Sequence, residues 1–141
     1  MEAAGRRAAF VAFAIVLLAG CPAASIKTHP IVGKVELKDG DVELLKGSHV
    51  ELRQETDPLI LPSGRITAGG TFTVQTLYQG EILSGAPEGK YKARIILGDE
   101  SDEGVPKRPP NLLHPRFLDF DKSGLTFTVP SSDYSVSLSR K

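Results

Sequence analysis

The chain of 141 residues contains no tryptophan, only one cysteine and no excess of charge of either sign. Its 17 basic and 17 acidic side chains balance, so the positive surface expected of a nucleic-acid-binding protein is missing. The same balance argues against a purely electrostatic contact with a membrane. A single cysteine excludes an internal disulfide, and an unpaired cysteine in an exported protein needs a separate explanation.

The rest of the composition predicts one domain built from strands. A chain of this length can bury one core but not two. The 14 glycines, the 10 prolines and the low aromatic content of 6% favour short strands joined by many turns. Beyond Cys21, no segment keeps the 3.6-residue apolar period of a substantial helix.

The N-terminal segment has the three zones of a secretory signal. Arg6 and Arg7 supply a positive start, residues 8–19 form an uncharged apolar run, and small residues follow. A membrane-spanning helix needs roughly 20 apolar residues, which is more than this run provides. The pattern therefore favours a signal over a permanent transmembrane anchor. A twin-arginine export signal is less well supported, because the two arginines lack the usual flanking residues.

The single cysteine stands at the end of this segment. The tetrad Leu18-Ala19-Gly20-Cys21 resembles the lipobox of bacterial lipoproteins. The resemblance implies a diacylglyceryl group on the Cys21 sulfur, cleavage between Gly20 and Cys21, and an acyl chain on the new N-terminus. Two or three such chains anchor a protein firmly, since each buried methylene contributes about 0.8 kcal/mol. The alternatives are an ordinary cleaved signal with an incidental cysteine, or an uncleaved helix.

The lipoprotein interpretation divides the chain into three parts. It predicts a lipoprotein signal peptide at residues 1–20, a lipidated tether at 21–30 and a β domain at 31–141. We expect the mature protein to be exported and attached to the cell envelope through its lipid. Pro22 is not the aspartate that signals retention in the inner membrane, so the outer membrane is the default expectation.

Six segments of the mature chain alternate apolar and polar residues with the period of two that is typical of strands. They are residues 31–37, 49–54, 71–77, 90–97, 125–129 and 134–138. The alternation predicts that one set of side chains faces a core, and this set includes Val50, Leu52, Phe72, Val74, Tyr91, Ala93, Ile95 and Leu97. Glycines at 69 and 70 supply the positive φ angles that a tight hairpin requires.

Three short motifs punctuate these segments: Gly33-Lys34-Val35, Gly69-Gly70-Thr71-Phe72 and Pro87-Glu88-Gly89-Lys90-Tyr91. They resemble the G-x-V, D/G-G-x-F and P-x-G-x-Y features of carboxypeptidase-regulatory-like and transthyretin-like domains. The chain is also similar to small bacterial lipoproteins that carry one such domain. The resemblance implies an all-β fold, an antiparallel seven-stranded Greek-key β-sandwich. The sequence departs from the family pattern at Gly69, where the family often has Asp or Asn, and in a first turn that is longer than usual.

The motif residues Gly33, Gly70, Phe72, Gly89 and Tyr91 are interpreted as structural. Phe72 is predicted to lie between the sheets. Tyr91 is predicted to bond its hydroxyl to upstream backbone, as in the tyrosine corner of sandwich folds. Such motifs specify a fold and leave function open.

No catalytic residue, metal site or cofactor is predicted. His29, His49 and His114 form neither an H-x-x-x-H nor an H-x-H pair. The hydroxyisourate hydrolases within the transthyretin-like fold end in Tyr-Arg-Gly-Ser, whereas this sequence reads SVSLSRK there. No G-x-S-x-G motif occurs, and lipidation would leave no free cysteine to act as a nucleophile.

Residues 98–116 form the most individual segment, in which acidic residues precede Lys107, Arg108 and several prolines. The spacing of a calcium loop is missing, so we expect a solvated segment whose charges neutralise each other. Five apolar residues here and just beyond are predicted to close one end of the sandwich, with a docking patch as the alternative: Leu112, Leu113, Phe117, Leu118 and Phe120.

These observations favour a non-enzymatic, lipid-anchored envelope protein whose sandwich is a structural or interaction module. Its partners would be the membrane, through the N-terminal lipid, and an unknown envelope protein or glycan. An alternative is an accessory protein that binds a carbohydrate or peptide, for which only Tyr78 and Phe117 are candidate aromatic platforms. A transthyretin-related hydrolase ranks last.

Overall fold

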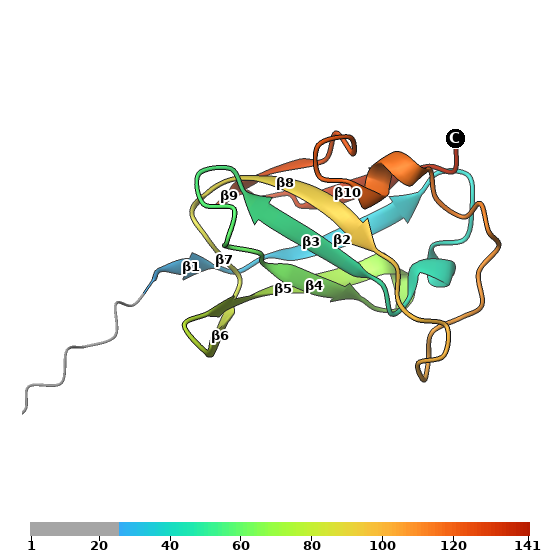
Figure 1. The fold of residues 1–141 in the computed structure, drawn as a ribbon, viewed down its shortest axis with the longest axis horizontal. Helices are drawn as coiled ribbons and strands as arrows, with labels where there is room; N and C mark the ends of the chain where they lie inside the picture. The colour runs from blue at the N-terminus through green and yellow to red at the C-terminus, as the bar shows by residue number, and fades with distance from the viewer. Residues whose placement is uncertain (1–25) are drawn as a thin grey trace, which may run out of the picture.

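The computed structural model describes residues 26–141, which form ten strands and three short 3₁₀ helices (Figure 1). The lipobox and Cys21 lie outside these residues. None of the helices within residues 26–141 is long and apolar enough to cross a membrane. The elements are β1 (Thr28–His29), β2 (Val32–Leu37), η1 (Val42–Leu45), β3 (His49–Gln54), β4 (Ser63–Ile66), η2 (Ala68–Gly70), β5 (Thr71–Tyr78), β6 (Glu81–Ser84), β7 (Ala86–Pro87), β8 (Gly89–Ile96), η3 (Pro115–Leu118), β9 (Thr126–Val129) and β10 (Ser135–Leu138).

Eight strands form one large sheet in the order β10-β2-β5-β4-β3-β8-β9, with β6 paired to the end of β5. β1 and β7 form a separate two-stranded sheet. The ring centroids of Phe127 on β9 and Tyr134 beside β10 are 5.9 Å apart, so the large sheet curls until its two edges approach each other. The described chain is all-β, as predicted, and its arrangement is compatible with a β-sandwich.

The prediction of seven strands, all antiparallel, is wrong in the number of strands and in the direction of one of them. Residues 26–141 form ten strands, and β10 runs parallel to β2, with Val136 opposite Val35. Between β9 and β10 the chain crosses from one edge of the large sheet to the other, so these strands cannot form a hairpin. The unpredicted strands β1, β4, β6 and β7 contain only two to four residues each, too few to show a clear alternation. One of them, β1, places Thr28–His29 within the folded region rather than in a free tether.

Alternate side chains of the strands point inward and form one hydrophobic core. The predicted inward residues of β3, β5 and β8 are buried, with Leu97 as the exception. Leu97 is 37% exposed because β8 ends at Ile96, so the alternation no longer applies to it. The largest fully buried side chains come from both halves of the sheet: Tyr91, Phe72, Ile31, Leu45, Leu52, Ile66, Ile95 and Leu138.

The apolar residues of the last long loop close one end of the core only in part. Leu112, Leu113 and Phe117 are buried, as predicted, and belong to the core. Leu118 is 40% exposed, and Phe120 lies on the outer side of the sheet against Arg53 and Arg94. Between β8 and η3 the chain forms neither strand nor helix, and this segment contains Pro106, Pro109 and Pro110.

The motif glycines are explained by close packing. A Cβ atom on Gly33 would overlap the ring of Phe72, which lies on the neighbouring strand β5. Gly70 has a φ of 81°, a backbone conformation that residues with a side chain rarely adopt. A Cβ atom on Gly89 would lie 2.9 Å from the side-chain amide nitrogen of Gln54. Each of these positions therefore has little room for a side chain or a backbone conformation that favours glycine.

Tyr91 forms the predicted corner. Its fully buried hydroxyl donates a hydrogen bond to the carbonyl oxygen of Pro87 at 2.6 Å. Burial raises the pKa of Tyr91 to about 12, because the phenolate would lose its hydration. The hydroxyl therefore joins β8 to the short strand β7 and is protonated at physiological pH.

The substitution Tyr91→Phe should lower the free energy of unfolding by about 1–2 kcal/mol at pH 8, because it removes one buried hydrogen bond. In the wild type, Tyr91 ionises more easily in the unfolded chain than in the folded one, so stability falls as the pH rises from 10 towards 12. The variant has no hydroxyl to ionise at this position, so the difference in unfolding free energy between the two proteins should shrink over that range. Urea unfolding followed by circular dichroism measures both effects.

The control for this experiment is Tyr78→Phe, since the Tyr78 hydroxyl makes no hydrogen bond within residues 26–141. This variant should unfold like the wild type at pH 8. A stability difference for Tyr91→Phe that stays constant from pH 8 to 12 would contradict the assignment of the buried hydroxyl.

Candidate functional site

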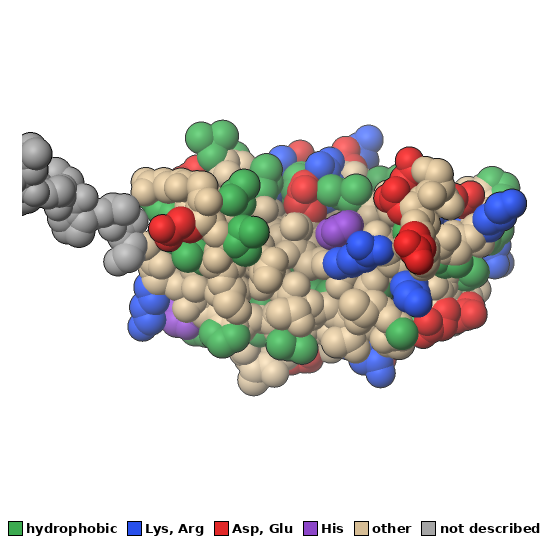
Figure 2. All heavy atoms as spheres, turned by 90° about the horizontal axis from the view of Figure 1, so that it is seen from below, with side chains coloured by type: hydrophobic (Ala, Val, Ile, Leu, Met, Phe, Trp, Pro, Cys, Tyr) green, Lys and Arg blue, Asp and Glu red, His purple; other side chains and the backbone are tan. Residues whose placement is uncertain are grey.

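The outer side of β3, β4 and β5 carries a continuous row of polar side chains. Because the apolar residues of these strands point into the core, the alternating positions face solvent. The polar residues line a shallow depression of about 340 Å³ and are His49, Ser63, Arg65, Thr67, Thr73 and Gln75. Figure 2 shows a face composed mostly of uncharged side chains, with a histidine and basic side chains near its centre.

The strand register brings these side chains together. Arg65 on β4 is opposite His49 on β3 and opposite Thr73 on β5. Ser63 is opposite Gln75 one step further along the same strands. Residues directly opposite one another in neighbouring strands present their side chains side by side. Three strands therefore fix one group of hydrogen-bonding side chains on a rigid surface, which we call the polar face.

Most of the polar face is free to bind other molecules. Within residues 26–141, the only side-chain hydrogen bond from this group is the one that the Thr67 hydroxyl donates to the Thr71 carbonyl oxygen, at 2.9 Å. The guanidinium group of Arg65 and the amide of Gln75 offer several donors, and the hydroxyl and amide oxygens offer acceptors. Such a surface suits a ligand rich in hydroxyl or peptide groups.

The aromatic platforms proposed for carbohydrate binding are not both available. Phe117 is only 2% exposed and packs in the core, so it cannot stack against a sugar ring. Tyr78 is half-buried at the end of β5, beyond the polar face. Recognition on this surface would therefore depend on hydrogen bonds more than on stacking.

The neighbouring outer surface of β3 and β8 is covered by a loop. The guanidinium carbons of Arg53 and Arg94 lie 4.6 and 4.5 Å from the centre of the Phe120 ring. Asp121 accepts hydrogen bonds from Arg53 at 2.9 Å and from Lys92 at 3.0 Å. We call these five residues the clasp, since their contacts hold the loop before β9 against the sheet.

The clasp also neutralises the depression beside it. This depression of about 370 Å³ is lined by Arg53, Gln54, Glu55, Pro58 and Lys92. Both of its cations are already paired with Asp121, and Glu55 adds a further negative charge. It is therefore a weaker candidate for anion binding than its two basic residues suggest.

The three histidines lie on separate elements. His29 belongs to β1, where its Nε2 is 3.9 Å from a carboxylate oxygen of Glu88. His49 is on the polar face, and His114 caps η3 by accepting a hydrogen bond from the Arg116 amide at 3.1 Å. Residues 26–141 contain no group of three side chains arranged to hold a metal ion.

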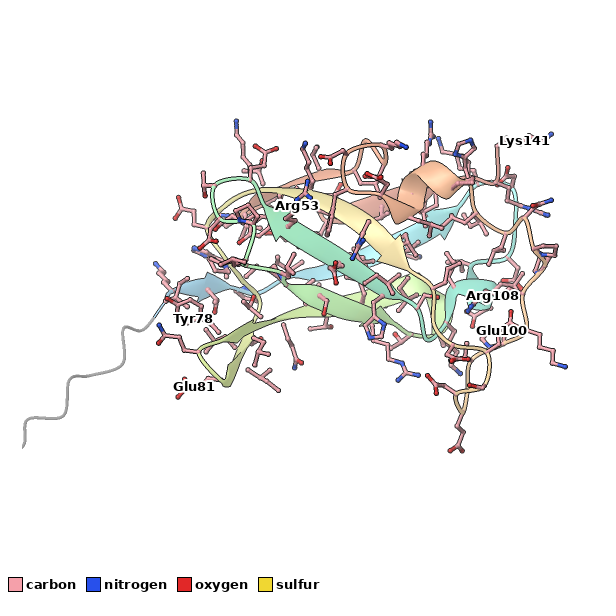
Figure 3. The ribbon with its side chains drawn as sticks, in the orientation of Figure 1. Arg53, Tyr78, Glu81, Glu100, Arg108 and Lys141 are labelled. Carbon is pink, nitrogen blue, oxygen red and sulfur yellow. The ribbon has the colours of Figure 1, made fainter. Side chains whose placement is uncertain are left out.

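The long loop is self-neutralising only in part, because Arg108 and Glu100, 3.9 Å apart, are its one charged pair within residues 26–141. Arg108 is also nearly buried, whereas the sequence predicts a solvated segment. Asp99 accepts hydrogen bonds from the amide and hydroxyl of Ser101, and Glu100 accepts one from the Arg108 amide at 2.8 Å. The Arg108 side chain is 9% exposed and donates to the Gly98 carbonyl oxygen. Figure 3 shows Glu100 and Arg108 together at the end of the domain away from β1.

Comparisons with protein families, with curated proteins and with solved structures give no match for this chain.

The clasp predicts a specific acid titration. Lys92, through its hydrogen bond and its charge, and then Arg53 hold the pKa of Asp121 below its usual value of 3.8. Because the folded-state pKa is lowered, the stabilising contribution of Asp121 is present above the unfolded-state pKa and is lost as the pH falls through the folded-state value. An NMR titration should place the Asp121 midpoint below 3.8 and show that Lys92→Ala raises it.

Lys122→Ala is the matched control, because Lys122 is adjacent in sequence whereas the lowered pKa of Asp121 is due to Lys92 and Arg53. It should leave the Asp121 midpoint in place. Equal midpoints in the wild type and in Lys92→Ala would show that the clasp does not form in solution.

Proposed function

We propose that this chain is a lipid-anchored cell-envelope protein whose β domain is a non-enzymatic interaction module. The observation that carries the proposal is the lipobox, Leu18 to Cys21, placed seven positions before the first strand at Thr28. Acyl chains on Cys21 would hold the domain at the membrane surface by a short link. Pro22 is not the aspartate that signals retention in the inner membrane, so the outer membrane is the proposed location.

The domain is proposed to be of the carboxypeptidase-regulatory-like or transthyretin-like type. Its all-β class and the structural roles of Gly33, Gly70, Phe72 and Tyr91 support this assignment. The parallel pairing of β10 with β2 departs from the expected all-antiparallel pattern. Fold type does not identify a partner, so the interaction surface has to come from the outer side chains.

The polar face is the surface that we propose for this interaction. It is built on the centre of the sheet, and its hydrogen-bonding groups are largely unused within residues 26–141. The same observation favours a second candidate function, an accessory protein that binds an envelope glycan or an extended peptide there. A transthyretin-related hydrolase is the least favoured function, because the Tyr-Arg-Gly-Ser of those enzymes is replaced here by SVSLSRK.

Cys21→Ser should abolish lipid attachment and cleavage after Gly20, because a hydroxyl cannot replace the thiolate as the acceptor of the diacylglyceryl group. Intact mass spectrometry of membrane-extracted protein reports cleavage and acylation together. The wild type should have the mass of the chain from residue 21 plus its acyl groups. Ala24→Ser is the control and should be processed like the wild type. If Cys21→Ser were processed and retained on membranes like the wild type, lipid anchoring would be disproved.

Two carboxylates on the polar face should block its ligand. For the double variant Thr73→Glu/Gln75→Glu we expect binding of soluble envelope glycan fragments, measured by NMR titration, to weaken at least about tenfold, the effect of losing one or two hydrogen bonds. The control Thr126→Glu/Thr128→Glu makes matched changes at exposed positions of β9. Equal weakening in both variants would show that the polar face is not the binding surface.

A further inference from the structure

An exposed apolar patch lies on the outer side of the sheet at one end. Leu77 on β5 and Ile82 on β6 are direct cross-strand partners, and each is 70% exposed. Leu61, which is 45% exposed, lies two residues before Ser63, the residue of β4 that pairs with Gln75 of β5. Single exposed apolar residues are common, but adjacent ones mark surfaces that contact something. We call Leu61, Leu77 and Ile82 the hairpin patch.

The hairpin patch lies at the end of the domain where the described chain begins. β1 contacts β6, and Figure 1 shows the β5–β6 hairpin beside β1. Figure 3 places Tyr78 and Glu81, which end β5 and begin β6, at this end, whereas Arg108 and Lys141 lie at the other. Apolar side chains are also gathered at this end in Figure 2.

The lipid proposed on Cys21 would hold this same end near the bilayer. Seven positions separate Cys21 from Thr28, and an extended chain advances at most about 3.6 Å per residue, so the link reaches no further than about 25 Å. The patch begins on strands next to β1. A link this short places the patch closer to the lipid surface than the loops at the far end of the domain.

The charges near the patch favour apolar rather than electrostatic contact. The charged residues on the segments that carry the patch or adjoin it are mainly acidic, since Glu55 and Asp57 precede Leu61 and Glu81 precedes Ile82, with Lys27 ahead of β1. A surface without excess positive charge gains little from anionic headgroups. Removing leucine and isoleucine side chains from water is favourable whatever the headgroup charge, so the patch suits the interfacial layer of a bilayer.

We propose that the hairpin patch enters the interfacial layer of the bilayer that holds the lipid anchor, so that the domain docks with its β5–β6 end against the membrane. This inference rests on the proposed lipidation of Cys21. Docking through three apolar side chains near the link would fix the orientation of the domain. The polar face on the neighbouring part of the sheet would then remain open to the aqueous phase.

The absence of tryptophan provides a direct test. The full lipidated chain with Leu77→Trp carries a single tryptophan reporter at the centre of the patch, and the 70% exposure of Leu77 allows the change without disturbing the core. Leu118→Trp is the matched control, because Leu118 is 40% exposed on η3, at the other end of the domain. Both proteins are reconstituted into phosphatidylcholine vesicles with and without brominated acyl chains.

Brominated lipid should quench the Leu77→Trp emission severalfold more strongly than the Leu118→Trp emission. The emission of Leu77→Trp should also shift to the blue on reconstitution, with little dependence on salt or on added anionic lipid. Equal quenching of the two reporters would overturn the proposal. A blue shift that increases with protein concentration, without quenching by brominated lipid, would show that a second copy of the chain covers the patch. This result would also overturn the proposal.

Intact mass measured on the same samples separates this inference from the lipid anchor. If Cys21 is acylated and Leu77→Trp is not quenched, docking fails while anchoring stands. If Cys21 is not acylated, the anchor fails, and the same protein is then mixed with preformed phosphatidylcholine vesicles. Quenching of Leu77→Trp on these vesicles supports the patch as a lipid contact, and its absence overturns that role.

Discussion

The contact between Gly33 and the ring of Phe72 shows the constraint on which this domain depends. β2 and β5 pair with Gly33 opposite Phe72, and a side chain on Gly33 would overlap the Phe72 ring that lies over the sheet. The inner surface of the sheet is thereby filled by one core, to which nearly every strand contributes alternate side chains. With the inner positions committed to packing, the sheet can contact other molecules only through its outer positions.

The outer positions are used in three ways, and the difference lies in what covers them. Over β3 and β8, Arg53 and Arg94 are engaged by Phe120 and Asp121, so their charges serve the structure. On the polar face, by contrast, Arg65 forms no hydrogen bond through its side chain within residues 26–141. At the β5–β6 end the outer positions are apolar. One curled sheet thus offers a closed, a polar and an apolar surface.

Sequence reasoning found the long strands, the buried corner at Tyr91 and the packing glycines, since alternation and turn chemistry are local signals. It did not find the parallel pairing of β10 with β2, because alternation fixes the face of a strand and not its neighbour. It also assigned Phe120 to the core, although two arginines on other strands provide an equally good place for an aromatic ring. The polar face was missed because its residues are separated in sequence and meet only through the register.

The pairing of β10 with β2 also bears on how the domain is assembled. Val35 and Val136 are about a hundred residues apart, and β2 has no other neighbour on that side of the sheet. Contacts between such distant segments form late, because a long loop has to close first. Until β10 has paired, the outer edge of β2 is an open strand edge to which other extended segments could pair. The last strand of the described chain is therefore also the one that protects β2 from such pairing.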